Sequence, residues 1–331
     1  MKKIFLILII PLLALSCKEK DCIDSPDVSG IQMQLSVQRL EKKLQQANTP
    51  DELETILSEH PVFSEFYLRR SQYPNDKILA KTFFDRIKNP GFDTLLMNTE
   101  SVFGNFSDER STFENAFKII KYYYPGFTPP QIETVVTGFV HDNYISDSLL
   151  ILGLDYYLGP EAKYRPAELP SYLLKRYQKP YLNPQVILVF SHFFNKTDPK
   201  DQTTLGDMIF YGKSYYFARH MLPCTPDSLF TGYTAFETID IEEHEQVIWA
   251  AFLENESLYE TNHFIKDKFF MERPKTLEIG EKCPGRIGRW VGWRIVNKYM
   301  ELHPDVTLPQ LMEMTDSQKI FRDSKYKPIP Y

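Results

Sequence analysis

The chain has 331 residues, of which 43% are hydrophobic and 14% aromatic, enough apolar material for a sizeable folded core. Its 38 basic and 44 acidic residues give a formal net charge of −6. This acidic balance, without a run of Lys and Arg long enough to follow a phosphate backbone, argues against a nucleic-acid-binding protein, so no nucleic acid is expected among the partners.

The first residues are typical of a bacterial lipoprotein leader. Met1-Lys2-Lys3 is a basic start, and residues 4–13 form an apolar run too short to cross a bilayer as a permanent helix. The small residue Ser16 then precedes Cys17, the arrangement that lipoprotein signal peptidase reads. We therefore predict that residues 1–16 are removed and that acylated Cys17 attaches the protein to a membrane of the cell envelope, in the periplasm or facing the outer membrane.

The segment after Cys17 is short, charged and contains a proline, so residues 17–28 are expected to be a lipid anchor and tether. No other linker and no internal repeat is evident. Residues 29–331 are therefore expected to form a single domain, with a helical part at 29–130 and a second part at 131–331.

The remaining cysteines are Cys22, Cys224 and Cys283, an odd number that cannot all pair within one chain. Cys224 and Cys283 could form a disulfide in an oxidising envelope, although the sequence favours free thiols over this pair. No cysteine spacing resembles a zinc knuckle.

Helical periodicity dominates both ends of the chain, and a short β-rich region lies between them. Helices are expected at 33–47, 50–57, 63–68, 78–87, 113–123, 169–177, 184–194, 204–221, 241–254 and 308–313. The β-rich run 132–140 and the apolar run 148–157 predict two strands, joined as a hairpin. The fold class expected is a predominantly helical α+β fold, with a small sheet and packed helices.

The most unusual helix is expected from Pro284 to about Met300. Proline fits the first helical turn, and Gly285, Gly288 and Gly292 follow at spacings that put them on one face. Each interior glycine costs roughly 1 kcal/mol of helix stability relative to alanine. This face is therefore expected to lie against another backbone, which is favoured, or against a ligand.

Arginines and tryptophans occupy the other faces of this helix. Arg286 with Trp290, Arg289 with Trp293, and Trp290 with Arg294 are four residues apart, which permits stacking of guanidinium groups on indole rings. Two of the arginines also stand at the helix N-terminus, the unfavourable end for cations. The favoured interpretation is neutralisation by acidic side chains, and the alternative is a site for an anion.

These residues also carry a family resemblance. Residues 284–296 (Pro-Gly-Arg-Ile-Gly-Arg-Trp-Val-Gly-Trp-Arg-Ile-Val), preceded by 249–259 and 211–217, resemble the gliding-motility lipoprotein B (GldB) family of Bacteroidetes, from about Asp142 onward. The resemblance implies a role in gliding or envelope assembly, with other envelope proteins as partners. A more distant similarity to predicted zinc-dependent proteases implies a degenerate zincin-like (metallopeptidase-like) fold for residues 131–331.

Such proteases need His-Glu-x-x-His on a helix, because two histidines four residues apart hold Zn²⁺ while the glutamate activates its water. If His192 takes the second histidine place, Leu188 and Val189 stand at the first histidine and the glutamate, and Tyr211 stands near the third ligand. None of these three supplies a zinc ligand or a base. The sequence therefore predicts no enzyme, no catalytic residues, no metal and no cofactor.

Three functions follow from these observations. The first is a non-catalytic envelope lipoprotein that acts as an interaction or assembly component. The second is a peptide- or glycan-binding lipoprotein using the cleft that a degenerate zincin would retain, and the third is a hydrolase with an unrecognised site. The candidate cleft or interaction residues are His192, Tyr211, Arg286, Arg289, Trp290 and Trp293.

Overall fold

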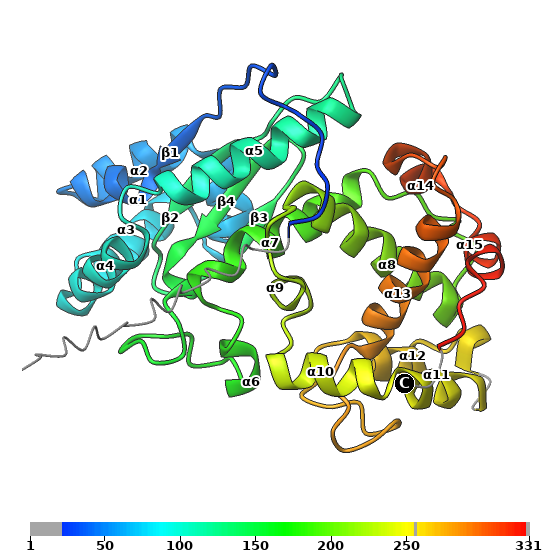
Figure 1. Ribbon diagram of the computed structural model, residues 1–331. Helices are drawn as coiled ribbons and strands as arrows, with labels where there is room; N and C mark the ends of the chain where they lie inside the picture. Colours follow the sequence, from blue (N-terminus) through cyan, green and yellow to red (C-terminus); the bar gives the residue numbers. More distant parts are fainter. Residues whose placement is uncertain (1–21, 255–256, 329–331) are drawn as a thin grey trace, which may run out of the picture.

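The computed structural model describes residues 22–254 and 257–328 (Figure 1). The predicted leader and Cys17 lie outside the described residues. The N-terminal part contains β1 (Val37–Arg39), α1 (Leu40–Gln46), α2 (Pro50–Glu59), α3 (Asp76–Ile87), α4 (Pro90–Phe103) and α5 (Ser107–Tyr123). The sheet is completed by β2 (Gln131–Val135), β3 (Asn143–Ile145) and β4 (Leu149–Gly153).

Helices make up most of the remaining chain. They are α6 (Ser171–Leu174), α7 (Lys179–Phe190), α8 (Thr204–Met221), α9 (Asp227–Thr231), α10 (Ala235–Glu243), α11 (Glu245–Glu254), α12 (His263–Phe270), α13 (Ile287–Leu302), α14 (Leu308–Glu313) and α15 (Ser317–Ser324). The predicted class, a predominantly helical α+β fold with a small sheet, is confirmed. None of the described helices is long and apolar enough to cross a membrane.

The sheet differs from the predicted hairpin. Its strand order is β1-β2-β4-β3; β1, β2 and β4 are parallel, and β3 is antiparallel to β4. The connection between β2 and β4 contains β3, so the chain reverses direction twice and β4 returns parallel to β2. The hairpin prediction was wrong because β3 has three residues, too few to show an alternating pattern.

The two faces of the sheet pack against different groups of helices. Ile132, Leu150 and Leu152 belong to a large core shared with α5, α7, α8 and α13. Val135 and Ile151 belong to a second core made by the N-terminal helices α1–α4. Successive residues of a strand point to opposite faces, so burial on both faces explains why β4 reads as an unbroken apolar run.

Three helix boundaries also differ from expectation. Residues 33–47 contain β1 before α1, and residues 169–177 contain only the four-residue α6. Helix α7 begins five residues before Pro184, which lies inside it instead of starting it. Helix α4 was not predicted, although Asn89 caps its first turn and Pro90 occupies its first position, a recognised start signal.

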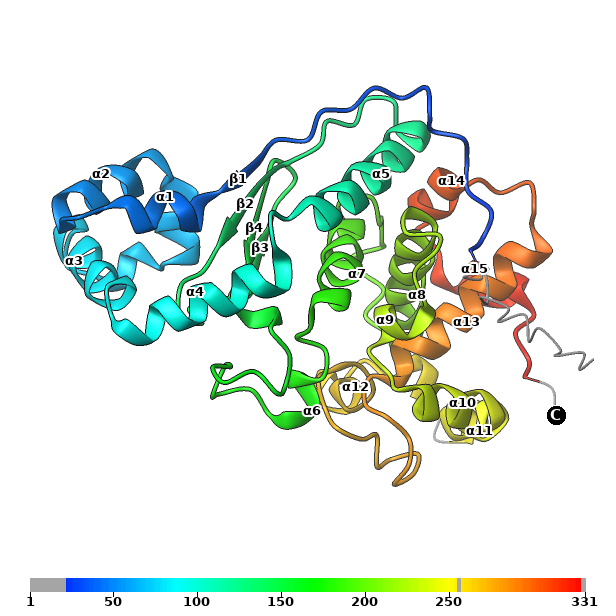
Figure 2. The same cartoon turned by 60° about the vertical axis from the view of Figure 1, so that its left-hand side comes forward.

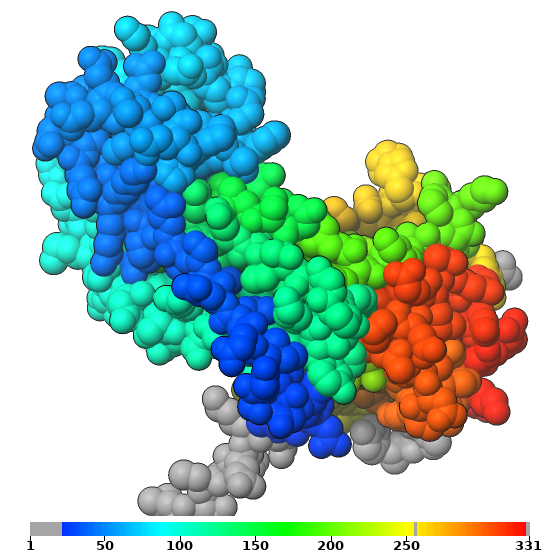
Figure 3. Space-filling view, turned by 90° about the horizontal axis from the view of Figure 1, so that it is seen from above, coloured from blue at the N-terminus to red at the C-terminus, as the bar shows by residue number. Residues whose placement is uncertain are grey.

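A disulfide between Cys22 and Cys224 links the N-terminal segment to the loop that follows α8. The alternative Cys224–Cys283 disulfide is therefore wrong. Cys283 is a buried free thiol whose sulfur lies 3.8 Å from the carbonyl oxygen of Pro284. Residues 23–36 then run over the surface to β1, beside α5 (Figures 2 and 3), with Val28 and Met33 packed against the large core.

Candidate functional site

Helices α8 and α13 cross in direct backbone contact at the centre of the large core (Figure 1). A Cβ atom added at Gly292 would overlap the carbonyl oxygen of Met208, and one added at Gly212 would overlap the carbonyl oxygen of Gly292. No side chain fits between these two backbones. The glycines thus serve close packing of two helices, the favoured interpretation of the sequence pattern.

The start of α13 departs from the prediction. The helix begins at Ile287, because Arg286 has a positive φ of 63° and Pro284 pairs with Lys275 as an isolated β-bridge. Gly285 therefore precedes the helix and is not part of its glycine stripe. It lies against the backbone of Arg273 instead, where an added Cβ would overlap the carbonyl oxygen.

Arg286 is 7% exposed and forms part of an ion cluster with Glu272, whose own side chain is 40% exposed. Its guanidinium donates to the carbonyl oxygen of Thr231, and its Nε lies 3.4 Å from a carboxylate oxygen of Glu272. Arg176 also donates to Glu272, at 3.0 Å for one of the two contacts. Burial opposes ionisation of Glu272, but the Arg176 hydrogen bonds and the charge of Arg286 hold its pKa below the ordinary value. The charge of Arg286 is thus neutralised by the carboxylate of Glu272.

Of the three expected arginine–tryptophan pairs, the structure contains Arg294 over Trp290, at 5.7 Å from the ring centroid. Arg289 turns instead to Tyr211, whose ring centroid lies 4.4 Å from the guanidinium carbon, and donates to the carbonyl oxygen of Phe270 at 2.7 Å. Trp293 stacks on Tyr215 at 5.2 Å. The candidate residues of α13 therefore separate into different environments.

The structure brings His192, Tyr211 and Arg289 together and places Arg286 in the ion cluster with Glu272. His192 follows α7 in a short 3-10 helix and packs against the ring of Phe210, 4.8 Å away between centroids. Desolvation and the charge of Arg289 lower the pKa of His192, so the imidazole is neutral at pH 7. Burial raises the pKa of Tyr211. Arg286, another of the candidate cleft residues, contacts Thr231 and Glu272 instead.

The residues at the other two zincin positions are aliphatic and lie in different surroundings. Leu188 packs against the large core, and Val189 is 44% exposed. His244 is exposed, and its Nδ1 lies 2.8 Å from the carbonyl oxygen of Asp240. Within residues 22–254 and 257–328, no three His, Cys, Asp or Glu side chains are grouped to hold a metal ion.

A polar cluster at the carboxyl ends of β2 and β4 was missed at the level of sequence. Asp155 is fully buried, and one of its carboxylate oxygens accepts N–H groups from Thr137, Gly138 and Phe139 at 2.9–3.0 Å. Burial raises the pKa of Asp155 to about 6 against the effect of these three donors. The carboxylate therefore fixes the loop that follows β2, where Gly138 and Phe139 both have positive φ.

The same loop is held by neighbouring side chains. Tyr177 donates to a carboxylate oxygen of Asp142 at 2.7 Å, and Arg69 donates to His141 at 2.8 Å. The edge of a parallel sheet at the carboxyl ends of its strands commonly binds ligands. Here the polar groups bind one another and hold residues 137–143 in place. The signal that could have found this cluster is an aspartate directly after an apolar strand, as in Gly153-Leu154-Asp155.

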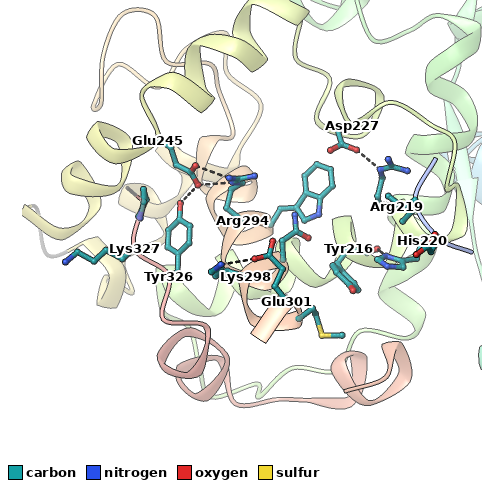
Figure 4. A pocket seen from close by; sticks show the side chains of 16 residues that line it. Tyr216, Arg219, His220, Asp227, Glu245, Arg294, Lys298, Glu301, Tyr326 and Lys327 are labelled. Carbon is teal, nitrogen blue, oxygen red and sulfur yellow. Dashed lines mark hydrogen bonds and ion pairs between the residues drawn. The ribbon is translucent and has the colours of Figure 1, made fainter. Parts of the chain in front are cut away.

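A cavity of about 760 Å³ opens where α8 and α13 end, between these helices and the C-terminal segment (Figure 4). Arg294 forms two hydrogen bonds with Glu245, at 2.8 and 3.1 Å, and Tyr326 donates to the same carboxylate at 2.7 Å. Arg219 pairs with Asp227 at 2.6 Å on the opposite wall. We call this cavity the α8–α13 pocket.

The rim of the α8–α13 pocket is formed by residues distant in sequence. Ile23 and Asp24 from the N-terminal segment and Lys327 from the C-terminal segment both line it. Lys298 and Glu301 of α13 also line it and pair with each other at 2.9 Å. Sequence reasoning placed Trp293 among the candidates but could not assemble segments more than 300 residues apart.

Comparison with known protein families matches residues 21–328 to the family described as gliding motility protein GldB. No curated protein and no solved structure matches the chain, so the more distant similarity to zinc proteases has no support from these comparisons. The match covers the N-terminal helices as well as the C-terminal blocks that resemble the family. The chain therefore belongs to the GldB family of gliding-motility lipoproteins.

Proposed function

We propose that this protein is a non-catalytic interaction or assembly component of the cell envelope, held at a membrane through acylated Cys17. The observation that carries the proposal is a group of exposed apolar side chains on α10, α11, α12 and the loop that follows. Its members are Phe236 (86% exposed), Ile239, Val247, Leu253, Phe264 (71% exposed), Met271 and Leu277. We call this group the α10–α12 surface.

The elements of the α10–α12 surface lie close together. Helix α10 leads directly into α11, and a contact of 3.5 Å between Lys275 and Glu237 ties the loop after α12 to α10. Figures 1 and 2 both show the three helices at one end of the molecule, opposite α1–α4. Exposed apolar side chains gathered on neighbouring helices in this way are what a surface covered by another protein would present.

Photo-cross-linking in intact cells tests the interaction. A benzophenone amino acid at Phe264 is compared with the same probe at Met97, which is 72% exposed but lies on α4 in the N-terminal part. We expect a discrete cross-linked envelope protein from position 264 only. Phe236→Asp should abolish that product, while Ile78→Asp, at an exposed position of α3, should leave it. Equal products from positions 264 and 97, or none from either, would contradict the proposal.

The non-catalytic part of the proposal is supported by what fills the position of a zincin site. Tyr211 stacks on Phe270 with ring centroids 5.7 Å apart. The guanidinium group of Arg289 also lies over the Tyr211 ring. A guanidinium beside His192 disfavours a second cation there. We expect elemental zinc well below one atom per chain in the dialysed protein, unchanged in His192→Ala. One equivalent of zinc that disappears in His192→Ala would favour a hydrolase instead.

A further inference from the structure

The disulfide controls how far the folded chain can lie from the lipid. Only four residues separate Cys17 from Cys22. A chain of this length spans at most about 18 Å, even when fully extended. Cys22 is bonded to Cys224, just beyond α8, and the amide of Ile23 donates to the carbonyl oxygen of Pro223 at 3.1 Å. The end of α8 is therefore confined to the neighbourhood of the lipid head groups.

The α8–α13 pocket lies at this confined end, since Ile23 and Asp24 form part of its rim. Its volume of about 760 Å³ is within the usual range for sites that bind small molecules. Its charged side chains are balanced: the cations are Arg219, Arg294, Lys298 and Lys327, and the anions are Asp24, Asp227, Glu245 and Glu301. A lining of this kind suits a ligand that carries both signs of charge better than a purely anionic one.

The charge pairs of the pocket differ in how firmly they are held. The Glu245 side chain is 12% exposed and binds both Arg294 and Tyr326, so this group is fixed. Lys298 and Glu301 are 47% and 63% exposed and lie three residues apart on one helix. Such an exposed pair contributes little to stability. A ligand bearing a phosphate and an ammonium group can therefore replace it, with the phosphate on Lys298 and the ammonium on Glu301.

We propose that the α8–α13 pocket binds the zwitterionic head group of a phosphoethanolamine lipid from the membrane that holds Cys17. The location beside the lipid depends on the acylation in the proposed function, whereas the charge match depends on the pocket alone. The head group meets the charges of Lys298 and Glu301 and the rings of Tyr326 and Trp293, which all line the pocket. Binding there orients the domain on the membrane, with the end of α8 toward the head groups.

The test uses the full-length protein and glycerophosphoethanolamine as a soluble probe, with binding followed by calorimetry and by intrinsic tryptophan fluorescence. We expect glycerophosphoglycerol and inorganic phosphate to bind at least tenfold more weakly, because neither carries an ammonium group for Glu301. Equal binding of inorganic phosphate would show a simple anion site and overturn the proposal. The absence of glycerophosphoethanolamine binding would overturn it as well.

A charge exchange gives the matched control. Lys298→Glu should weaken glycerophosphoethanolamine binding at least tenfold, and the double exchange Lys298→Glu with Glu301→Lys should restore it because both charges return. Lys319→Glu, an exposed position of α15 outside the pocket, should bind like the unaltered protein. Unchanged binding in Lys298→Glu would contradict the assignment.

The anchoring through Cys17 and the assignment of the pocket can be tested separately. The Cys17→Ala protein should no longer be found in the membrane fraction. It should bind glycerophosphoethanolamine as before. A Cys17→Ala protein that is still processed at the same site and stays in the membrane fraction overturns the anchoring and, with it, the membrane origin of the head group. Loss of probe binding in the acylated protein overturns the pocket assignment alone.

Discussion

The two halves of the α8–α13 pair are built in opposite ways. Tyr211 meets Arg289 and Tyr215 meets Trp293, so the contacts advance in the same direction along both helices. In the first half, the backbones of Met208 and Gly212 touch the backbone of Gly292. In the second half, residues 216–220 and 293–301 face each other across the α8–α13 pocket.

The difference shows how residue size divides one helix pair into a closed half, where the backbones touch, and an open half, which lines the α8–α13 pocket. Glycine lets the backbones meet, and this contact fixes the distance and crossing of the helices. Beyond it the side chains are long and charged, and their charges are paired or hydrated instead of buried alone. The closed half thus determines the width of the pocket without contributing a side chain to its chemistry.

The largest effect is expected for Gly292→Ala. Its added Cβ would overlap the backbone of Met208, which cannot turn aside as a flexible side chain can. Overpacking costs about 3 kcal/mol, which exceeds the gain of about 1 kcal/mol in helix propensity. Chemical denaturation should therefore show a net loss of about 2 kcal/mol, and a larger loss for Gly292→Leu.

Asn297→Ala is the matched control in the open half of the same helix. Its side chain lines the pocket and is half-buried, so the free energy of unfolding should change by less than about 0.5 kcal/mol. If Gly292→Ala proves as stable as Asn297→Ala, the two halves do not differ in packing and the comparison fails.

A middle-sized effect distinguishes the arginines of the two halves. Arg294→Ala leaves Glu245 without its cation, at a position where the carboxylate side chain is 12% exposed. Because Arg294 itself is 42% exposed, solvent screening limits the loss to about 1 kcal/mol. Arg289→Ala loses the contact with the Tyr211 ring and one hydrogen bond, and we expect less than about 1 kcal/mol.

The double variant Arg294→Ala with Glu245→Gln checks the cause. Neutralising the carboxylate should recover part of the loss measured by thermal or chemical unfolding, because no unpaired charge remains. A double variant less stable than Arg294→Ala alone would mean that Glu245 is stabilised by Tyr326 and other neighbours, and that the arginine is incidental.

Sequence reasoning reached the closed half but not the open one. The spacing of Gly288 and Gly292 on one helix predicted that another part of the chain lies very close to this face. In the structure, the backbone of α8 lies against Gly292, and Phe270 lies against Gly288. The sequence could not show where the helix begins, because Arg286 adopts a left-handed backbone conformation that tertiary contacts impose. Similarly, an arginine near a helix N-terminus demanded an anion, yet nothing in the sequence identified Glu272 as that partner.

The open half depends on contacts between distant segments, for which the sequence holds no local signal. Cysteine spacing cannot fix connectivity, so the pairing of Cys22 with Cys224 was missed. Without that pairing, nothing placed Ile23 and Lys327 around the same pocket. The same limit explains the sheet: apolar runs located β2 and β4, but their parallel order depends on the short β3 between them.

A smaller effect than that of Gly292→Ala is expected for Gly288→Ala, one turn earlier. An added Cβ would lie 2.7 Å from a ring carbon of Phe270 and 3.2 Å from the carbonyl oxygen of Phe269. A ring can shift by a few tenths of an ångström, whereas the Met208 backbone facing Gly292 cannot. The cost of this adjustment is offset by about 1 kcal/mol of helix propensity, so the net change should stay within about 1 kcal/mol. Urea denaturation of Gly288→Ala and Gly292→Ala side by side measures the difference. Losses of equal size would mean that the ring of Phe270 is as immobile as backbone, and closeness to α8 would no longer distinguish the two glycines.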